Sequence, residues 1–225
     1  MNKKISYIIT ISLFILFIIF TIIVKLVDVK QLGVEGTKIG LSSFNTSIRD
    51  NLPFNNTWYK ITKYLGVLWF VVCGLFGVYG IYQLIKEKSL KKIDKKLIIL
   101  FIIYALVILT YILFEFIFIN YRPVLLDGKK EYSYPSSHTL LTISLFIPSA
   151  LYIYKSNFNK IFKIITITSL LALTLIIIIG RFLSGVHWAT DILGGIILGS
   201  FFVSLYISLN YFFIKKEEPT KEEQE

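Results

Sequence analysis

Apolar and polar positions divide the chain into long blocks, with six hydrophobic runs separated by polar segments. The runs cover residues 5–24, 64–84, 97–119, 139–154, 161–179 and 192–213. Because about 20 apolar residues in a helix cross the hydrocarbon core of a bilayer, this pattern predicts an all-α fold, an integral membrane bundle of six transmembrane helices. The fourth run is the shortest and contains Pro148, which predicts a kink in that helix.

The two ends of the chain differ in pattern. The first run follows the letters MNKK and has no small-residue cleavage site, which favours a retained anchor over a cleaved signal peptide. At the other end the letters KKEEPTKEEQE, residues 215–225, carry charges without apolar periodicity. Residues 1–214 are therefore predicted to form one membrane domain, followed by a charged flexible tail.

Composition and charge agree with a membrane protein. Hydrophobic residues make up 55% of the chain and the mean hydropathy is +0.70, values typical of membrane proteins. The net charge of +10 comes from lysines in short loops beside the apolar runs, which favours contact with anionic headgroups of the phospholipid bilayer and not with nucleic acid. The single cysteine, Cys73, excludes a disulfide within the chain.

The lysines also predict how the chain is oriented. They are dense at the N-terminus, in the segments 86–96 and 155–163, and in the tail, which six spans place on one side. Since basic short loops stay in the cytoplasm, both termini are expected there. The segments 25–63, 120–138 and 180–191 then lie on the extracytoplasmic face. The Ile- and Lys-rich composition is typical of bacteria of low GC content, so the membrane is expected to be a bacterial plasma membrane.

The outer segments hold the unusual polar residues of the chain. Both histidines, His138 and His187, lie there, as do Arg122 and Arg181, two of only three arginines among 24 basic residues. Where lysine is the usual cation, an arginine at a particular position favours bidentate binding of phosphate. An arginine that only anchors the chain at the interface is the alternative, but two arginines beside both histidines favour phosphate.

The letters GRFLSGVHWATD, residues 180–191, give an informative spacing. If the last helix begins near His187, then His187 and Asp191 are four residues apart and project from one face. The carboxylate can then accept a hydrogen bond from one imidazole nitrogen and leave the other unprotonated, which makes a nucleophile with its orienting group. A simpler interpretation, compatible with the first, is that Asp191 stabilises the N-terminus of the helix.

The letters YPSSH, residues 134–138, precede the fourth run. A serine-rich turn at a helix N-terminus offers backbone N–H groups and hydroxyls to an anion, although such a turn is more often only a cap. A protonated His138 at its edge could donate a proton to a departing oxygen. Zinc sites usually need three or four protein ligands, and no further histidine or usable cysteine is present at the outer face, so we predict no metal and no cofactor.

Together YRP (residues 121–123), YPSSH and GRFLSGVHWATD resemble the three signature motifs of the type 2 phosphatidic acid phosphatase (PAP2) family of membrane lipid phosphatases. The resemblance covers residues 115–195 and implies the six-helix fold of that family. It implies that His187 attacks phosphorus, that Asp191 orients it and that His138 protonates the leaving group. The phosphate oxygens would be held without a metal by Arg122, Arg181 and Ser136.

Three positions depart from the family pattern. A lysine usually stands seven residues before the arginine of the first motif, where this chain has Glu115. Ser137 replaces a glycine in the second motif and joins the predicted phosphate-binding residues, and Gly180 replaces a serine in the third. Lys129 or Lys130 could supply the missing positive charge. A carboxylate at the position of Glu115 is costly unless paired, so it is expected to be functional or bonded to a neighbouring helix.

The sequence therefore predicts a metal-independent hydrolase that cleaves a lipid phosphate or diphosphate at the outer face through a phosphohistidine intermediate. Undecaprenyl diphosphate, phosphatidylglycerophosphate and phosphatidic acid are the candidate substrates. One alternative is a phosphotransferase that uses the same intermediate, and another is a transporter or scaffold without turnover, which Glu115 favours. Trp58 and Tyr59 are expected along the interface, beside the route of lipid entry. No motif predicts an oligomeric state.

Overall fold

The structure, a computed structural model, describes residues 2–214. These residues form helices joined by turns and loops, and none of them belongs to a β-strand. Six of the helical segments are long and apolar enough to cross a membrane. The predicted all-α bundle of six transmembrane helices is thus confirmed, whereas the predicted tail, 215–225, lies outside the described residues.

The elements follow the hydrophobic runs. The long helices are α1 (Lys3–Leu26), α4 (Leu68–Glu87), α5 (Lys95–Glu115), α6 (Ser137–Lys155), α7 (Lys160–Leu183) and α8 (Ala189–Ile214). The short elements η1 (Val34–Gly36), α2 (Ser42–Arg49) and α3 (Asn56–Leu65) fill the segment between α1 and α4, and η2 (Leu90–Lys92) joins α4 to α5. Four helices begin where an Asn or Asp side chain accepts a hydrogen bond from a free backbone N–H of the first turn, namely Asn2, Asn55, Asp94 and Asn159.

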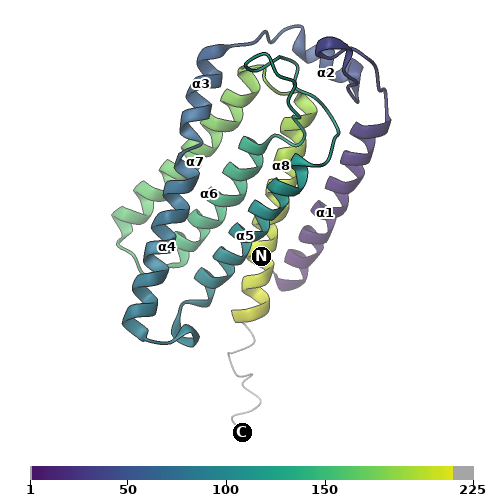
Figure 1. Cartoon of the computed structure of the whole chain (residues 1–225). Helices are drawn as coiled ribbons and strands as arrows, with labels where there is room; N and C mark the ends of the chain where they lie inside the picture. Colours follow the sequence, from purple (N-terminus) through teal and green to yellow (C-terminus); the bar gives the residue numbers. More distant parts are fainter. Residues whose placement is uncertain (1, 215–225) are drawn as a thin grey trace.

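Helices α6 and α8 form the centre of the bundle (Figure 1). Helix α6 packs against α4, α5, α7 and α8, and α8 also packs against α1 and α5. In the span of α6, 67% of the residues are buried inside the protein, compared with 17% in α1 and α7. The helix continues through Pro148 from Ser137 to Lys155, so the fourth predicted span is confirmed as one helix.

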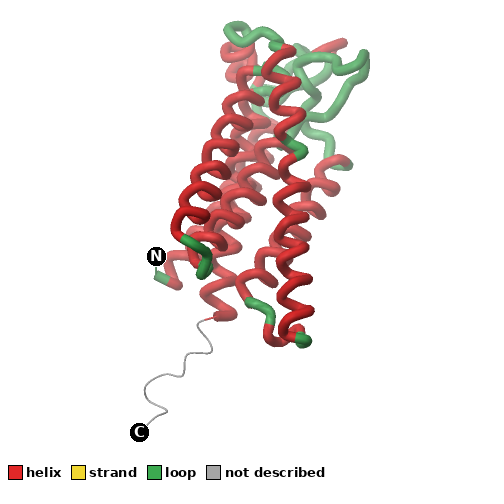
Figure 2. The backbone as a smooth tube through the Cα atoms, turned by 90° about the vertical axis from the view of Figure 1, so that its left-hand side faces the viewer, coloured by secondary structure: helices red, strands yellow, loops and turns green. Residues whose placement is uncertain are grey.

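The two ends of the bundle carry different structures. Loops 27–55, 116–136 and 184–188 gather at one end, which is uppermost in Figure 2 and which we call the loop end. The start of α1, the end of α8 and the η2 turn lie at the opposite end. All three motif segments therefore share the loop end.

Polar side chains join the helices inside the bundle. The hydroxyl oxygens of Ser6 and Ser208 lie 2.7 Å apart and connect α1 to α8. The indole N–H of Trp69 donates to the hydroxyl of Thr142 at 2.9 Å and connects α4 to α6. Hydrogen bonds between membrane helices contribute roughly 0.6–2 kcal/mol each, so such contacts fix the positions of the two central helices.

The second span begins earlier than the sequence analysis predicted. Helices α3 and α4 together cover Asn56–Glu87, 32 residues, instead of 64–84. Trp58 and Tyr59, predicted to lie in a loop along the interface, belong to α3, which packs against α7. The prediction was wrong there because α3 carries polar residues on one face and so lacks a continuous apolar run, while Asn55 caps it as a helix.

The third span ends earlier than predicted, at Glu115 instead of 119. Phe116 closes the helix by donating its N–H to the carbonyl three residues before it, at 3.1 Å. Asn120 is fully buried beyond the helix, where its side-chain oxygen accepts a hydrogen bond from the backbone N–H of Gly40 at 3.1 Å. The apolar letters after Glu115 therefore belong to a packed loop that is tied to the segment before α2.

Candidate active site

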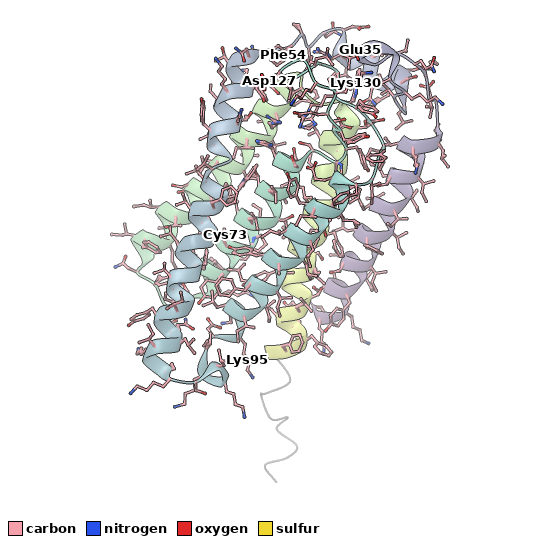
Figure 3. All side chains as sticks on the ribbon, viewed as in Figure 1. Glu35, Phe54, Cys73, Lys95, Asp127 and Lys130 are labelled. Atoms are coloured by element: carbon pink, nitrogen blue, oxygen red, sulfur yellow. The ribbon has the colours of Figure 1, made fainter. Side chains whose placement is uncertain are left out.

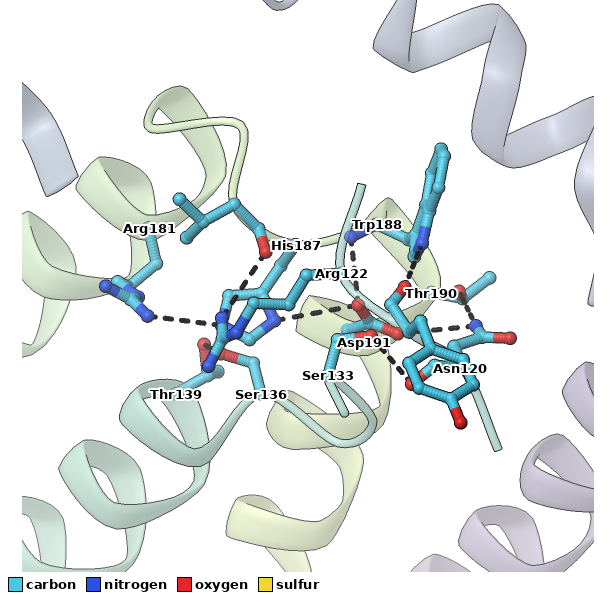
Figure 4. Close-up of polar contacts among 12 residues, drawn as sticks. Asn120, Arg122, Ser133, Ser136, Thr139, Arg181, His187, Trp188, Thr190 and Asp191 are labelled. Atoms are coloured by element: carbon cyan, nitrogen blue, oxygen red, sulfur yellow. Dashed lines mark hydrogen bonds and ion pairs between the residues drawn. The ribbon is translucent and has the colours of Figure 1, made fainter. Parts of the chain in front are cut away.

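The three motif segments meet at the loop end (Figure 4). In loop 116–136 an antiparallel bridge pairs Tyr121 with Tyr132, which sets Arg122 beside Glu131. The turn between α7 and α8 carries His187, and α6 begins directly after the second motif. The structure thus brings together side chains that lie far apart in the sequence, such as Arg122 and His187, which are 65 positions apart.

His187 is 4% exposed, and its Nε2 atom faces two guanidinium groups. Arg122 Nη1 lies 3.0 Å from Nε2 and Arg181 Nη2 lies 3.3 Å from it. Because a guanidinium group only donates hydrogen bonds, Nε2 is the unprotonated acceptor and the ring proton is on Nδ1. Burial, reinforced by Arg122 and Arg181, holds the pKa of His187 well below its usual range. The ring is therefore neutral at pH 7, with its lone pair directed at the two arginines.

Asp191 lies on the other side of the imidazole and is fully buried in the first turn of α8. Its Oδ2 atom lies 3.6 Å from His187 Nδ1 and accepts a hydrogen bond from the backbone N–H of Trp188 at 2.9 Å. The four-residue spacing does place the two side chains together, although 3.6 Å is longer than a hydrogen bond. Asp191 thus caps the start of α8, as one interpretation of the sequence suggested, and also faces the imidazole, although His187 Nδ1 makes no hydrogen bond with it.

Arg181, in the last turn of α7, is held by α3. The side chain is 1% exposed and its guanidinium carbon lies 5.6 Å from the centre of the Tyr59 ring, an arrangement that permits a cation–π interaction. Its Nη1 atom also lies 3.5 Å from the hydroxyl of Thr62. Tyr59 and Thr62 were missed as site residues. A signal existed in the letters NTWYKITKYL, where aromatic and hydroxyl residues recur at helical spacing.

Gly180 explains one departure from the family motifs. A Cβ atom at this position would come within 2.6 Å of the Thr62 side chain and 2.9 Å of the Trp58 ring. A serine would therefore push α3 away from α7. The glycine permits the close contact through which α3 reaches Arg181.

Arg122 is shared between His187 and a carboxylate. Its Nε atom donates to Glu131 Oε2 at 2.9 Å, while its backbone N–H donates to the Glu131 carbonyl at 2.9 Å. The Arg122 side chain is 11% exposed and that of Glu131 is 47% exposed. The salt bridge leaves Nη1 of Arg122 directed toward His187.

The two serines of the second motif lie in different surroundings. Ser136 is fully buried, and its hydroxyl accepts a hydrogen bond from Thr139 at 3.1 Å. Its backbone N–H donates to the carbonyl of Asp191 at 2.9 Å. Ser137 lines the cavity next to His187. The hydroxyl of Ser136 is therefore engaged within the protein, and Ser137 is the serine that faces the cavity.

His138 lies in the first turn of α6 and packs edge-on against Trp69, with the ring centres 4.8 Å apart. The bond from Trp69 to Thr142 fixes the indole on which the imidazole rests. The ring is close enough to interact electrostatically with Arg181 and Arg122. Its Nδ1 atom is buried without a hydrogen-bond partner, and His138 is not among the residues that line the cavity next to His187.

A cavity of about 30 Å³ opens between His187 and the end of α5. This volume holds about two water molecules, so a phosphate group can contact Nε2 only if the two guanidinium groups move apart. The residues that line the cavity are Tyr111, Phe114, Glu115, Arg122, Tyr132, Ser133, Tyr134, Pro135, Ser137, Leu140 and His187.

Lys129 and Lys130, the two residues that could supply the positive charge of the family lysine, lie away from this cavity. Lys130 Nζ pairs with Glu35 Oε2 at 2.7 Å on the exposed surface of the loop end (Figure 3). Lys129 is exposed at the tip of loop 116–136, where its backbone pairs with that of Leu126. Neither lysine lines the cavity, whereas Glu115 does. Among the described residues, the cavity therefore has a carboxylate where the family pattern has a cation.

A buried amide network, absent from the sequence analysis, supports Asp191 from behind. Asn45 of α2 donates to the Thr190 hydroxyl at 2.9 Å and accepts from the Thr190 backbone N–H at 3.1 Å. Asn120 Nδ2 lies 3.4 Å from both Thr190 Oγ1 and Asp191 Oδ1. All four residues are at most 1% exposed. No spacing rule links Asn45 to Asp191, because only tertiary packing brings them together.

Within residues 2–214 there is no group of three or more His, Cys, Asp or Glu side chains that could hold one metal ion. The groups that meet at Nε2 of His187 are two guanidinium groups, which suit an anion.

A histidine lone pair held between two guanidinium groups suits attack on a phosphoryl group. Because this histidine lies at one end of a six-helix membrane bundle, the fold and the site together indicate a membrane phosphatase. The family model of the PAP2 superfamily matches residues 95–215, more than half of the chain. The chain belongs to the PAP2 superfamily.

The comparison with solved structures agrees on the fold. A transmembrane PAP2-type phosphatidylglycerolphosphate phosphatase from Bacillus subtilis matches with a TM-score of 0.61, covering 94% of this chain and 98% of that chain at 17% identity. At this identity the likeness supports the fold alone. Comparison with curated proteins gives no match.

Proposed function

We propose that this membrane phosphatase hydrolyses the phosphate of a lipid by way of a phosphohistidine intermediate on His187. The observation that carries the proposal is the position of Nε2, an unprotonated nitrogen 3.0 Å and 3.3 Å from two guanidinium groups. Phosphatidic acid, phosphatidylglycerophosphate and undecaprenyl diphosphate are candidate substrates, since each presents a terminal phosphoryl group at the membrane surface.

The reaction has two steps. In the first, Nε2 of His187 bonds to phosphorus while the bond from phosphorus to the leaving oxygen breaks, and His138 gives that oxygen a proton. In the second, water bonds to phosphorus, the P–N bond breaks, and His138 takes back a proton. Arg122 and Arg181 move from Nε2 to the phosphoryl oxygens, where charge builds up in the transition state.

Asp191 keeps the imidazole in the reactive form. Its carboxylate faces Nδ1 at 3.6 Å, which favours a proton on Nδ1 and stabilises the positive charge that the ring gains when Nε2 is phosphorylated. No step needs a metal ion, so we expect phosphate release to continue in EDTA. Inhibition by EDTA that zinc or magnesium reverses would contradict this scheme.

We further propose that the site faces away from the cytoplasm. Lysines are dense in the segments 86–96 and 155–163, which lie at the end of the bundle opposite the site. Short basic loops stay in the cytoplasm, so the termini would be cytoplasmic and the loop end would meet the headgroups of the outer leaflet. Alkylation of single cysteines introduced at Lys91 and Lys129, in intact cells, tests the orientation, since only the second should react with an impermeant reagent.

Trapping of the intermediate tests the mechanism. The purified protein is mixed with a ³²P-labelled lipid phosphate, quenched within milliseconds and examined for acid-labile label. His187→Ala should lose both label and turnover. His138→Ala should lose turnover of the lipid but still accumulate label from p-nitrophenyl phosphate, whose leaving group needs no proton. Label that persists in His187→Ala would reject the assignment of the nucleophile.

A further inference from the structure

The substrate side of the site holds an unusual balance of charge. Arg122 and Arg181 are the two cations at Nε2. Glu131 forms a salt bridge with Arg122 at 2.9 Å, and Glu115 lines the same cavity as Arg122 and His187. One carboxylate is thus paired with Arg122 and another lies in the wall of the cavity, so together they offset part of the positive charge of the two guanidinium groups.

The placement of Glu131 is built into loop 116–136. The Tyr121–Tyr132 bridge and the backbone bond from Arg122 to Glu131 hold the two charged residues opposite each other. The side chain of Arg122 is 11% exposed, so its charge is only partly screened by water. The carboxylate therefore acts on whatever Arg122 binds, both by orienting the guanidinium group and by its own negative charge.

Glu115 lines this cavity and is otherwise exposed. It is the last residue of α5, and the cavity extends from His187 to that position. Nucleophile and leaving group lie in line in phosphoryl transfer, and this cavity is the space next to His187 into which we infer that the leaving group extends. In a phosphate monoester the leaving group is a neutral alcohol. In a diphosphate it is a second phosphate, which brings additional negative charge toward Glu115 in the cavity wall and toward Glu131 at Arg122.

We propose that Glu131 and Glu115 are specificity-determining residues that make this site select lipid phosphate monoesters over lipid diphosphates. The proposal rests on the proposed function, since it concerns the substrate of the same site. It narrows the substrate class to lipids with one terminal phosphate, such as a phosphatidyl or prenyl monophosphate.

A matched pair of substrates tests the selection, a prenyl monophosphate and a prenyl diphosphate of the same chain length. The measured quantity is the ratio of kcat/KM for the monophosphate to kcat/KM for the diphosphate. Glu131→Gln keeps an oxygen that can accept from Arg122 Nε but removes the charge. Since Glu131 is 47% exposed and partly screened, we expect the ratio to fall about 3- to 10-fold. Glu115→Gln should lower it by a similar factor.

The control is Glu35→Gln, which removes a carboxylate from the same end of the protein at a residue paired with Lys130. Its ratio should stay within about 2-fold of the parent, because exposed charges are screened beyond about 10 Å at 0.1 M salt. The change in this ratio in the Glu131 and Glu115 variants should also become smaller in 1 M salt. A change caused by lost packing would not depend on salt in this way.

A role in orientation alone predicts a different pattern. In that case Glu131→Gln leaves the ratio unchanged, Glu131→Ala lowers kcat/KM for both lipids by the same factor, and Glu115→Gln is silent. That result overturns the proposal. An unchanged ratio in both glutamine variants also overturns it, whatever the alanine variant does.

The same variants separate this inference from the proposed function. If the parent releases phosphate from neither lipid, the proposed function fails, and binding then tests the charge argument by itself. Calorimetry with orthophosphate and pyrophosphate gives the ratio of the two Kd values. Glu131→Gln should improve pyrophosphate binding relative to orthophosphate about 3- to 10-fold, and equal effects on both anions overturn the inference.

Discussion

Replacement of Arg181 by lysine tests whether its planar guanidinium group or only its charge is needed. Lysine keeps the positive charge but has a single nitrogen, which cannot contact a phosphate oxygen while also occupying the positions of both Nη atoms. In the structure these atoms lie 3.3 Å from His187 Nε2 and 3.5 Å from the Thr62 hydroxyl. Arg181→Lys therefore loses at least one charge-assisted hydrogen bond to the transferred phosphoryl group.

The size of the effect follows from that lost bond. A hydrogen bond to a charged group contributes about 1.5–3 kcal/mol, and each 1.4 kcal/mol corresponds to about one power of ten in rate. We therefore expect kcat/KM to fall roughly 10- to 150-fold. Loss of the cation–π contact with Tyr59, seen at 5.6 Å, lowers stability separately by about 0.5–2 kcal/mol, and thermal unfolding measures that loss.

The assay is the release of inorganic phosphate from a lipid phosphate in detergent micelles, with kcat and KM measured separately. Arg49→Lys is the matched control, since Arg49 donates to the carbonyl of Leu52 on the same end of the protein and forms no bond with His187. Its kcat/KM should stay within about 2-fold of the parent. Full activity of a folded Arg181→Lys protein would refute the reasoning and leave Arg181 as an interfacial anchor.

Three other predictions follow from buried groups near the site. Asn120→Ala removes the amide 3.4 Å from Asp191 and should lower kcat about 10-fold with little change in KM, while Asn159→Ala, which removes a helix cap at the far end, should leave both unchanged. The pKa of His187 is held below its ordinary value of 6.5, so its contribution to stability is fully present above pH 6.5 and is lost as pH falls below it. The Tm should therefore fall as the pH is lowered below 6.5, and the Tm of His187→Gln should fall less steeply over the same range. Gly180→Ser forces an atom to within 2.6 Å of Thr62 and should destabilise the fold by about 1–3 kcal/mol, measurable by thermal unfolding; an unchanged Tm would mean that α3 shifts freely.

The sequence was informative where one physical rule decides the structure. Long apolar runs must cross the bilayer as helices, so the spans were predicted to within a few residues except at α3 and at the end of α5. The four-residue spacing of His187 and Asp191 likewise predicted that the two side chains face each other, although His187 lies in the turn before α8 and only Asp191 lies in the helix.

Other site residues depend on packing between distant segments. Tyr59 reaches Arg181 only because Gly180 lets α3 approach α7. Asn45 reaches Thr190 across 145 positions of sequence. No local sequence pattern predicts contacts between segments so far apart in the chain. The positions of Lys130 and Glu115 relative to the cavity depend on the path of loop 116–136, and a hydropathy pattern does not predict the path of a loop.

The unequal lengths of the spanning helices have a consequence for kinetics. The α3–α4 span has 32 residues and α6 has 19, or about 48 Å and 29 Å of helix at 1.5 Å per residue. A hydrocarbon core is about 30 Å thick, so α6 matches that thickness, whereas the α3–α4 span exceeds it at the loop end, where α3 packs against α7. The lipid substrate can then react while its tails stay in the leaflet, and encounters occur by two-dimensional diffusion. The rate should thus depend on the mole fraction of substrate in the membrane surface, and dilution with inert lipid at constant bulk concentration should slow it.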